Sequence, residues 1–162
     1  MRIGLIADTH IPDVVRALSS ELCEALRGVD LILHAGDIYI SSVLDDLELI
    51  APVYAARGDD DCGDIERDPR VRERHELEVG GLSLWLCHQR PWQGDHYAPD
   101  IVVFGHDHQV VVQRHSGTLY VNPGSPYFPG YRRGPGTVGI LEVSDGWAEA
   151  HIVPLEHLPP AL

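Results

Sequence analysis

The sequence of 162 residues carries 25 acidic and 12 basic side chains, which gives a formal net charge of −13 at pH 7. This length fits one domain with a substantial core and is short for two. A field of this sign repels the phosphate backbone of a long nucleic acid and an anionic membrane, so the composition argues against both partners. The three cysteines have no C-x-x-C spacing, and no apolar run approaches a membrane span. We therefore expect a cytoplasmic protein with reduced thiols.

The first third of the chain alternates between apolar strands and helices. Strands are expected at residues 2–7, 29–34 and 52–56, and helices at residues 21–27 and 43–50. Serines that favour the N-cap position precede both helices. Strand–helix–strand repeats give parallel neighbours joined by right-handed crossovers.

The rest of the chain changes to hairpins. Gly80-Gly81 and Asp145-Gly146 are two-residue hairpin turns, which separate apolar runs at 74–79, 82–87, 137–143 and 147–153. A third hairpin is expected from residues 109–114 and 118–121, and a short buried strand at 101–104. The two patterns together predict an α/β fold of two mixed β-sheets packed as a sandwich with flanking helices, in a single domain over residues 1–162.

Residues that can bind metal ions follow five of the expected strands. The set consists of Asp8, His10, Asp37, Asp59, His88, His106 and His108. Because the carboxyl ends of strands form the ligand crevice in open α/β folds, we expect these side chains to converge. Three carboxylates and four imidazoles, with no cysteine, suit two borderline divalent metals such as Mn, Fe, Ni or Zn.

The same residues form an ordered set of motifs. These are Asp8-x-His10, Gly36-Asp37, Gly58-Asp59-x-Asp61, His88 and Gly105-His106-x-His108. The set resembles the successive motifs of the calcineurin-like metallophosphoesterases. In addition, Asn122-Pro123-Gly124-Ser125 resembles the small bacterial and archaeal phosphodiesterase branch, which also contains the scaffold subunit of the retromer complex.

The resemblance implies a metallophosphoesterase fold with two divalent transition metals, manganese being favoured. One metal would be held by Asp8, His10 and His108, and the other by Asp59, His88 and His106. Asp37 would bridge the two metals, together with a hydroxide that attacks the phosphorus atom. The residues assigned to catalysis are Asp37, Asp59 and His88.

Two positions depart from the family pattern. Asp59 replaces the asparagine of the family, which adds a negative charge and should tighten metal binding while weakening the attraction for an anionic substrate. Asp60 occupies the position of a histidine that helps to protonate the leaving group in many relatives. No general acid is assigned unless the pKa of Asp60 is raised in the site.

Other polar residues carry weaker signals. Asp60, Arg90 and His96 are candidate substrate contacts. We expect His34 to be buried or to support the ligands, and Asp61 to hold the loop at Gly58. Surface positions are expected for His75, His115, His151 and His157. Phosphate contacts are conceivable for Arg57, Arg90, Arg132 and Arg133, but ion pairs with the abundant acids are the expectation for each.

The sequence thus predicts a phosphodiesterase that acts on a small phosphodiester or nucleotide and could form a homo-oligomer. One alternative is a phosphomonoesterase or nucleotide-polyphosphate hydrolase with the same metals. Another is a catalytically weak scaffold, like the retromer subunit. That scaffold has partly lost the histidines, so the four that remain here favour the enzyme.

Overall fold

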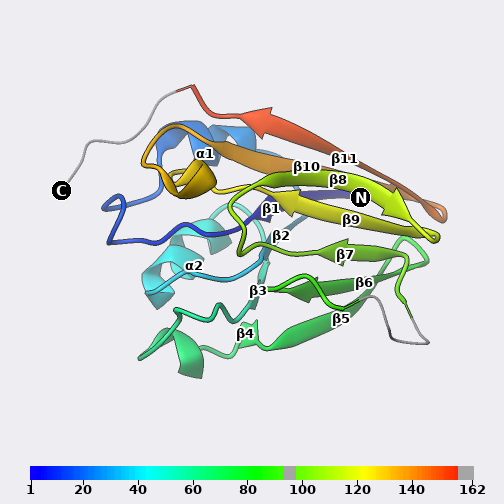
Figure 1. Cartoon of the computed structure of the whole chain (residues 1–162), viewed down its shortest axis with the longest axis horizontal. Coiled ribbons are helices and arrows are strands. Elements are labelled where there is room, and N and C mark those ends of the chain that lie inside the picture. Colours follow the sequence, from blue (N-terminus) through cyan, green and yellow to red (C-terminus); the bar gives the residue numbers. More distant parts are fainter. Residues whose placement is uncertain (93–97, 157–162) are drawn as a thin grey trace.

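Two β-sheets form the centre of the molecule (Figure 1). The computed structural model describes residues 1–92 and 98–156. The strands of the first sheet are β1 (Arg2–Ile6), β2 (Leu31–His34), β3 (Val53–Ala56), β4 (Val71–Arg72), β10 (Thr137–Ser144) and β11 (Trp147–Pro154). The strands of the second sheet are β5 (Arg74–Val79), β6 (Leu82–Cys87), β7 (Ile101–Val103), β8 (Val110–His115) and β9 (Thr118–Pro123).

Both sheets are mixed. The first has the strand order β11-β10-β1-β2-β3-β4, in which β1 to β4 are parallel and β10 runs antiparallel to β1. The second has the order β5-β6-β7-β9-β8, with β6, β7 and β9 parallel and an antiparallel strand at each edge. The carboxyl ends of the parallel strands therefore lie at one end of each sheet.

Two short helices cover the outer face of the first sheet. Helix α1 (Ser20–Ala25) begins after Ser19, whose hydroxyl accepts the Leu22 N–H at 3.1 Å. Helix α2 (Ser41–Glu48) follows the extended residue Ile40. Both helices start and end one or two residues before the expected ranges, and the chain reverses after α1 at Gly28, which has a positive φ of 75°.

Alternation along the strands of the first sheet builds two apolar layers. Ile3, Leu5 and Leu33 point toward the second sheet and pack between the sheets. Ile6 and Ile32 point to the other side and pack with the helices. The predicted sandwich of two mixed sheets with flanking helices is confirmed, and both helices lie on the same side of it (Figure 1). None of the described helices is long and apolar enough to cross a bilayer.

Two details differ from the expectation. Residues 62–73, for which no strand is expected, contain the 3-10 helix η1 (Ile65–Arg67) and also the strand β4. The expected surface position of His75 is wrong, since its side chain is buried and its Nε2 lies 3.0 Å from the Ala55 carbonyl oxygen and 3.1 Å from that of Arg70. His75 occupies an inward-facing position of β5, where the two carbonyls replace water as its partners. His115 and His151 are exposed as expected, and His157 lies outside the described residues.

Candidate metal centre

The strand ends bring all seven candidate ligands together. Asp8 and His10 follow β1, Asp37 follows β2, Asp59 follows β3, His88 follows β6, and His106 and His108 follow β7. Within the described residues these side chains form two groups. In each group the ligand atoms all lie within 4.8 Å of one another. The first group contains Asp8, His10, Asp37 and His108, and the second contains Asp59, His88 and His106.

The backbone at these positions is strained. Five of the seven candidates have a positive φ between 47° and 72°, namely Asp8, His10, Asp37, His106 and His108. Residues other than glycine seldom adopt this conformation, and where they do, the strain often serves a functional site. Backbone bonds between strand ends hold the conformation, including Asp8 N to Gly36 O at 2.9 Å and Gly105 N to His88 O at 2.9 Å.

The first group is buried. His10 Nε2 lies 3.0 Å from His108 Nε2, and Asp8 Oδ1 lies 3.8 Å from the same His108 atom. Two imidazole nitrogens that face each other at this distance need a proton or a cation between them, because two lone pairs repel. The other oxygen of Asp8, Oδ2, is buried and has no hydrogen-bond partner in the described part of the chain. Both features fit a bound cation.

The second group is more open. Asp59 Oδ1 lies 2.7 Å from His88 Nε2 and 3.0 Å from His106 Nδ1, and the two nitrogens are 3.2 Å apart. His88 is buried, whereas the side chain of Asp59 is half exposed. This group therefore faces the solvent while the first group lies deeper.

A single carboxylate lies between the two groups. Asp37 Oδ2 lies 3.8 Å from His10 Nε2 in the first group and 3.6 Å from His88 Nε2 in the second. Its other oxygen, Oδ1, accepts the backbone N–H of Asp60 at 3.2 Å. Asp37 is thus oriented by a hydrogen bond on one side and presents one oxygen to both groups.

Hydrogen bonds to the second ring nitrogen orient three of the histidines. Nδ1 of His88 lies 2.7 Å from the Ala35 carbonyl oxygen, and Nδ1 of His108 lies 2.8 Å from that of Phe128. Nδ1 of His10 lies 2.5 Å from the Tyr39 hydroxyl. Each contact turns Nε2 toward the centre, as is typical of histidines that bind metal. Tyr39 and Phe128 stand in no motif, so their role cannot be predicted from the sequence.

Asp61 supports the loops that carry Asp37 and Asp59, as expected. Its buried carboxylate accepts the N–H groups of Gly58 and Asp37 on one oxygen and those of Ile38 and Tyr39 on the other, at 2.7 to 3.1 Å. Gly58 packs so tightly on Asp37 that a Cβ atom at this position would overlap its carboxylate. The G-D-x-D motif thus allows the two loops to touch.

Further buried polar residues hold the neighbouring backbone. His34 is fully buried and its Nε2 lies 3.1 Å from the Thr9 hydroxyl, which confirms its supporting position. The Asn122 amide donates to Gly105 O at 2.9 Å, and the Ser125 hydroxyl donates to Asp8 O at 2.7 Å. The Asn-Pro-Gly-Ser motif therefore fixes the loops that follow β1 and β7.

Burial shifts the pKa values of the first group toward uncharged forms. Desolvation, reinforced by the charge of Asp37, raises the pKa of Asp8 to about 8. Desolvation also raises the pKa of Asp37 to about 6, although His88 opposes this, and desolvation with His108 nearby lowers the pKa of His10 to about 4. Desolvation alone would raise the pKa of Asp59, but its own backbone N–H and the two histidines together lower it below the ordinary value. Among the described residues, the positive charge near these two buried carboxylates does not offset their desolvation.

The candidate substrate contacts have different environments. Asp60 lines a pocket of about 340 Å³ beside the two groups, together with Asp13, Val14, Tyr39, Phe128 and Tyr131. Arg90 instead places its guanidinium 4.3 Å from the centre of the Tyr120 ring, and Arg57 pairs with Glu66 and Glu73. His96 lies outside the described residues.

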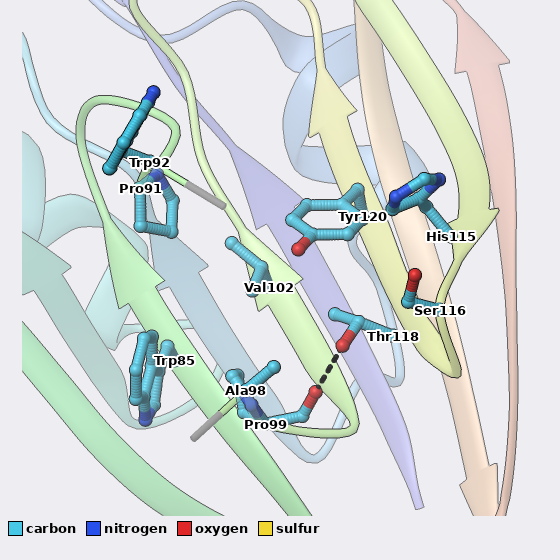
Figure 2. Close-up of a pocket in the computed structure, with 10 residues that line it drawn as sticks. All are labelled: Trp85, Pro91, Trp92, Ala98, Pro99, Val102, His115, Ser116, Thr118 and Tyr120. Atoms are coloured by element: carbon cyan, nitrogen blue, oxygen red, sulfur yellow. Dashed lines mark hydrogen bonds between the residues drawn. The ribbon is translucent and has the colours of Figure 1, made fainter. Parts of the chain in front are cut away.

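Tyr120 belongs to a separate pocket on the outer face of the second sheet (Figure 2). Figure 2 shows Trp85, Val102 and Tyr120 on the strands, with Pro91 and Trp92 above them. This pocket measures about 170 Å³ and its lining includes none of the seven candidate ligands. Because the Arg90 guanidinium stacks on the Tyr120 ring, the Arg90 side chain lies at this outer face.

Comparisons with known proteins agree with this geometry. Residues 1–146 match the model of the calcineurin-like phosphoesterase superfamily domain. A probable metallophosphoesterase of Methanothermobacter thermautotrophicus is 32% identical, over 94% of this chain and 92% of that protein. A phosphodiesterase of Methanocaldococcus jannaschii is 27% identical, over 88% and 93% respectively. Vps29 of Entamoeba histolytica, solved in complex with Zn²⁺, superposes with a TM-score of 0.72 over 95% of this chain and 99% of that chain, at 22% identity. This last likeness concerns the fold alone.

Proposed function

The chain belongs to the calcineurin-like phosphoesterase superfamily, and from this we propose that it is a phosphodiesterase with two divalent metals that hydrolyses a small phosphodiester or nucleotide. The observation that carries the proposal is the position of Asp37, whose Oδ2 lies within 3.8 Å of a histidine in each group. A carboxylate shared in this way suits a pair of cations roughly 4 Å apart.

The residues present fit such a pair. Asp8, His10 and His108 would hold one metal and Asp59, His88 and His106 the other, with Asp37 bound to both. Asp8 Oδ2, which has no hydrogen-bond partner among the described residues, and the facing nitrogens of His10 and His108 support this assignment. When bound, the metals would polarise the phosphoryl group and activate a water molecule. Manganese is the metal we favour, with iron, nickel and zinc as alternatives.

The chain itself contributes position and charge. Asp61 holds the two loops, and Tyr39 and the carbonyls of Ala35 and Phe128 fix the imidazole rings. Asp37, Asp59 and His88 lie at the junction of the two groups, where a phosphoryl group would be bound. With a metal-activated water as the nucleophile, the reaction would need no side chain as a covalent nucleophile.

Two other functions remain as alternatives. A phosphomonoesterase or polyphosphate hydrolase would use the same ligands, so only substrate comparison separates it from a phosphodiesterase. A scaffold would not need all seven ligands, and their convergence favours the enzyme. We also propose that the protein is cytoplasmic. Its net charge of −13 repels the phosphate backbone of long nucleic acids, so we propose that these are not its substrates.

The test combines metal analysis with hydrolysis of bis(4-nitrophenyl) phosphate and 4-nitrophenyl phosphate in added Mn²⁺. Two metals per chain and a preference for the diester are expected. Asp37→Asn should lose metal at both positions and activity by more than about 100-fold, because one carboxylate serves both cations. His115→Ala, at an exposed position on β8, is the control. Two metals and full turnover in Asp37→Asn would contradict the assignment.

A further inference from the structure

One wall of the pocket beside the two ligand groups is aromatic. Tyr131 and Phe128 lie at the 3-10 helix η2 (Pro129–Tyr131) and just before it, and both line the pocket of about 340 Å³. Their rings are almost perpendicular, with an interplanar angle of 86° and centroids 6.3 Å apart. Together they form a corner, here called the aromatic corner, directly beside His108.

Tyr131 is fixed and yet exposed. Its hydroxyl donates to the His106 carbonyl oxygen at 2.9 Å, and its ring stacks on His108 with centroids 4.3 Å apart and an angle of 24°. Its exposed fraction is nevertheless 55%. A ring that is held at its hydroxyl and covered on one face leaves the opposite face open. A rigid open face of this kind is a stacking surface for another flat ring, and its ordering costs little at binding.

The charges of the pocket select against highly charged ligands. The described residues that line it include the acids Asp13 and Asp60 and no arginine, and the chain contains no lysine, since all 12 of its basic residues are arginines. Arg133, which does not line the pocket, donates to the Val14 carbonyl oxygen at 3.2 Å. Beyond the two ligand groups, these walls offer no cation for a second phosphate. Arg57 lines a neighbouring cavity at Asp59 and His88, but it is paired with Glu66 and Glu73, so the described residues favour a substrate with one negative charge.

We propose that the aromatic corner of Tyr131 and Phe128 is a specificity site that binds a flat aromatic ester group, a nucleobase or an aryl ring, of a singly charged phosphodiester. This inference rests on the proposed phosphodiesterase function and names the substrate class. Tyr131 provides the stacking face, and Phe128, whose ring centroid lies 5.5 Å from that of His108, belongs to the same wall. The phosphate then lies at the two ligand groups, because His108 belongs to the first group and touches the Tyr131 ring.

Calorimetry on the Mn²⁺-loaded protein with two symmetric diesters tests the proposal. Diphenyl phosphate and diethyl phosphate carry the same single charge and differ in their flat groups, whichever ester group enters the corner. Diphenyl phosphate should bind about tenfold more tightly, as is typical of stacking on one aromatic side chain. Tyr131→Leu should remove this difference, whereas Tyr131→Phe, which keeps the ring, should retain it. Tyr54→Leu is the matched control, since Tyr54, on β3, is also an exposed tyrosine whose ring contacts a histidine, His75 of β5.

The outcomes separate the specificity from the catalytic function. Equal affinities for the two diesters, or a difference that persists in Tyr131→Leu, would overturn the aromatic corner. Metal content is measured in every variant. A substitution that disturbs ligation at His108 would lower the metal content and the affinity for both diesters alike, whereas loss of the stacking face lowers the affinity for diphenyl phosphate alone. The methyl ester of adenosine 5′-monophosphate, as a third probe, assigns the corner to a nucleobase if it binds more tightly than diphenyl phosphate and to an aryl ring otherwise. Absence of bis(4-nitrophenyl) phosphate hydrolysis would contradict the phosphodiesterase, while calorimetry still decides on the corner.

Discussion

At the scale of single residues, Asp59 distinguishes this chain from the pattern that its motifs resemble. Its Oδ1 lies within 3.0 Å of both His88 and His106, so it occupies the position expected of a ligand. An asparagine would keep the oxygen but not the charge, which is the single negative charge of the second group. The substitution therefore changes the electrostatics of the centre more than its shape.

Asp59→Asn should weaken the second metal and strengthen the attraction for an anionic substrate. We expect about a tenfold loss of affinity for the second Mn²⁺ and a lower KM for bis(4-nitrophenyl) phosphate, because one negative charge leaves the site. Titration calorimetry measures the first effect and steady-state kinetics the second. Asp145→Asn makes the same change of charge at an exposed turn and should alter neither. If neither quantity moves in Asp59→Asn either, Asp59 does not bind metal.

The sequence was sufficient to select the seven ligand candidates but not the aromatic residues around them. Each candidate follows an apolar strand, and strand ends converge in this type of fold. Tyr39 and Tyr131 take their places through left-handed backbone, with φ of 81° and 61°, and through contacts with residues far along the chain. Nothing in a tyrosine's local sequence signals such a conformation, so only the structure could reveal it.

At the scale of elements, Asp61 joins the loops after β2 and β3. Asp61→Asn should lower the free energy of unfolding by about 3 kcal/mol, since an amide cannot accept four N–H bonds as a carboxylate does and leaves buried donors unsatisfied. Denaturant unfolding of the metal-free protein measures this. Asp64→Asn is the matched control, because Asp64 accepts the Ser41 N–H at 3.2 Å at an exposed position, where water can replace the lost bond, and it should lose much less stability than Asp61→Asn. Equal losses in both variants would contradict the role of Asp61.

His75 links β5 of the second sheet to β3 of the first through the Ala55 carbonyl oxygen. Burial lowers its pKa, although the two carbonyl contacts oppose the shift. Below the ordinary pKa of about 6.5 the unfolded chain gains a proton that folded His75 does not, so acidification should cost stability. His34, whose pKa burial lowers to about 3, acts in the same direction.

His75→Gln should therefore reduce the loss of stability between pH 7 and pH 5. The removed contribution is at most about 1.4 kcal/mol per pH unit over this interval. Urea unfolding of the chelator-treated protein at several pH values provides the slope. His115→Gln, at an exposed position, should leave the slope as in the parent. A His75→Gln slope identical to the parent slope would show that this histidine titrates normally in the fold.

The elements themselves were largely predictable because alternation and turn residues define them. The expected ranges 74–79 and 82–87 coincide with β5 and β6, which flank the Gly80-Gly81 turn. Strand β4 was not expected, because a pair of residues, Val71 and Arg72, is too short to show a period of two. The burial of His75 was missed for a related reason, since a polar residue in an inward position breaks the apolar alternation on which the prediction depends.

At the scale of the whole molecule, the metal-free fold carries a cost at its centre. Desolvation raises the pKa of Asp8 to about 8, far above the ordinary value of an aspartate. A group whose folded pKa is raised stabilises the fold at low pH, and that contribution is lost as the pH rises through the interval from about 4 to 8. In a chain with a net charge of −13, bound cations would relieve this cost and stabilise the folded state by mass action.

The effect of Asp8→Asn on the melting temperature should consequently change sign when metal is present. In chelator at pH 8.5 the variant should melt a few degrees above the parent, because the amide is never charged. At pH 5.5, where the buried carboxyl of the parent is protonated, the difference should shrink. With Mn²⁺ the order should invert, since the parent can bind the cation through Asp8 Oδ2, which has no partner among residues 1–92 and 98–156, and the variant cannot. Melting curves by circular dichroism, with Asp145→Asn as the control, measure all three comparisons. If neither Mn²⁺ nor chelator changes the melting temperature of the parent protein, the metal centre is contradicted. If Mn²⁺ raises the melting temperature of Asp8→Asn as much as that of the parent, Asp8 is not a ligand.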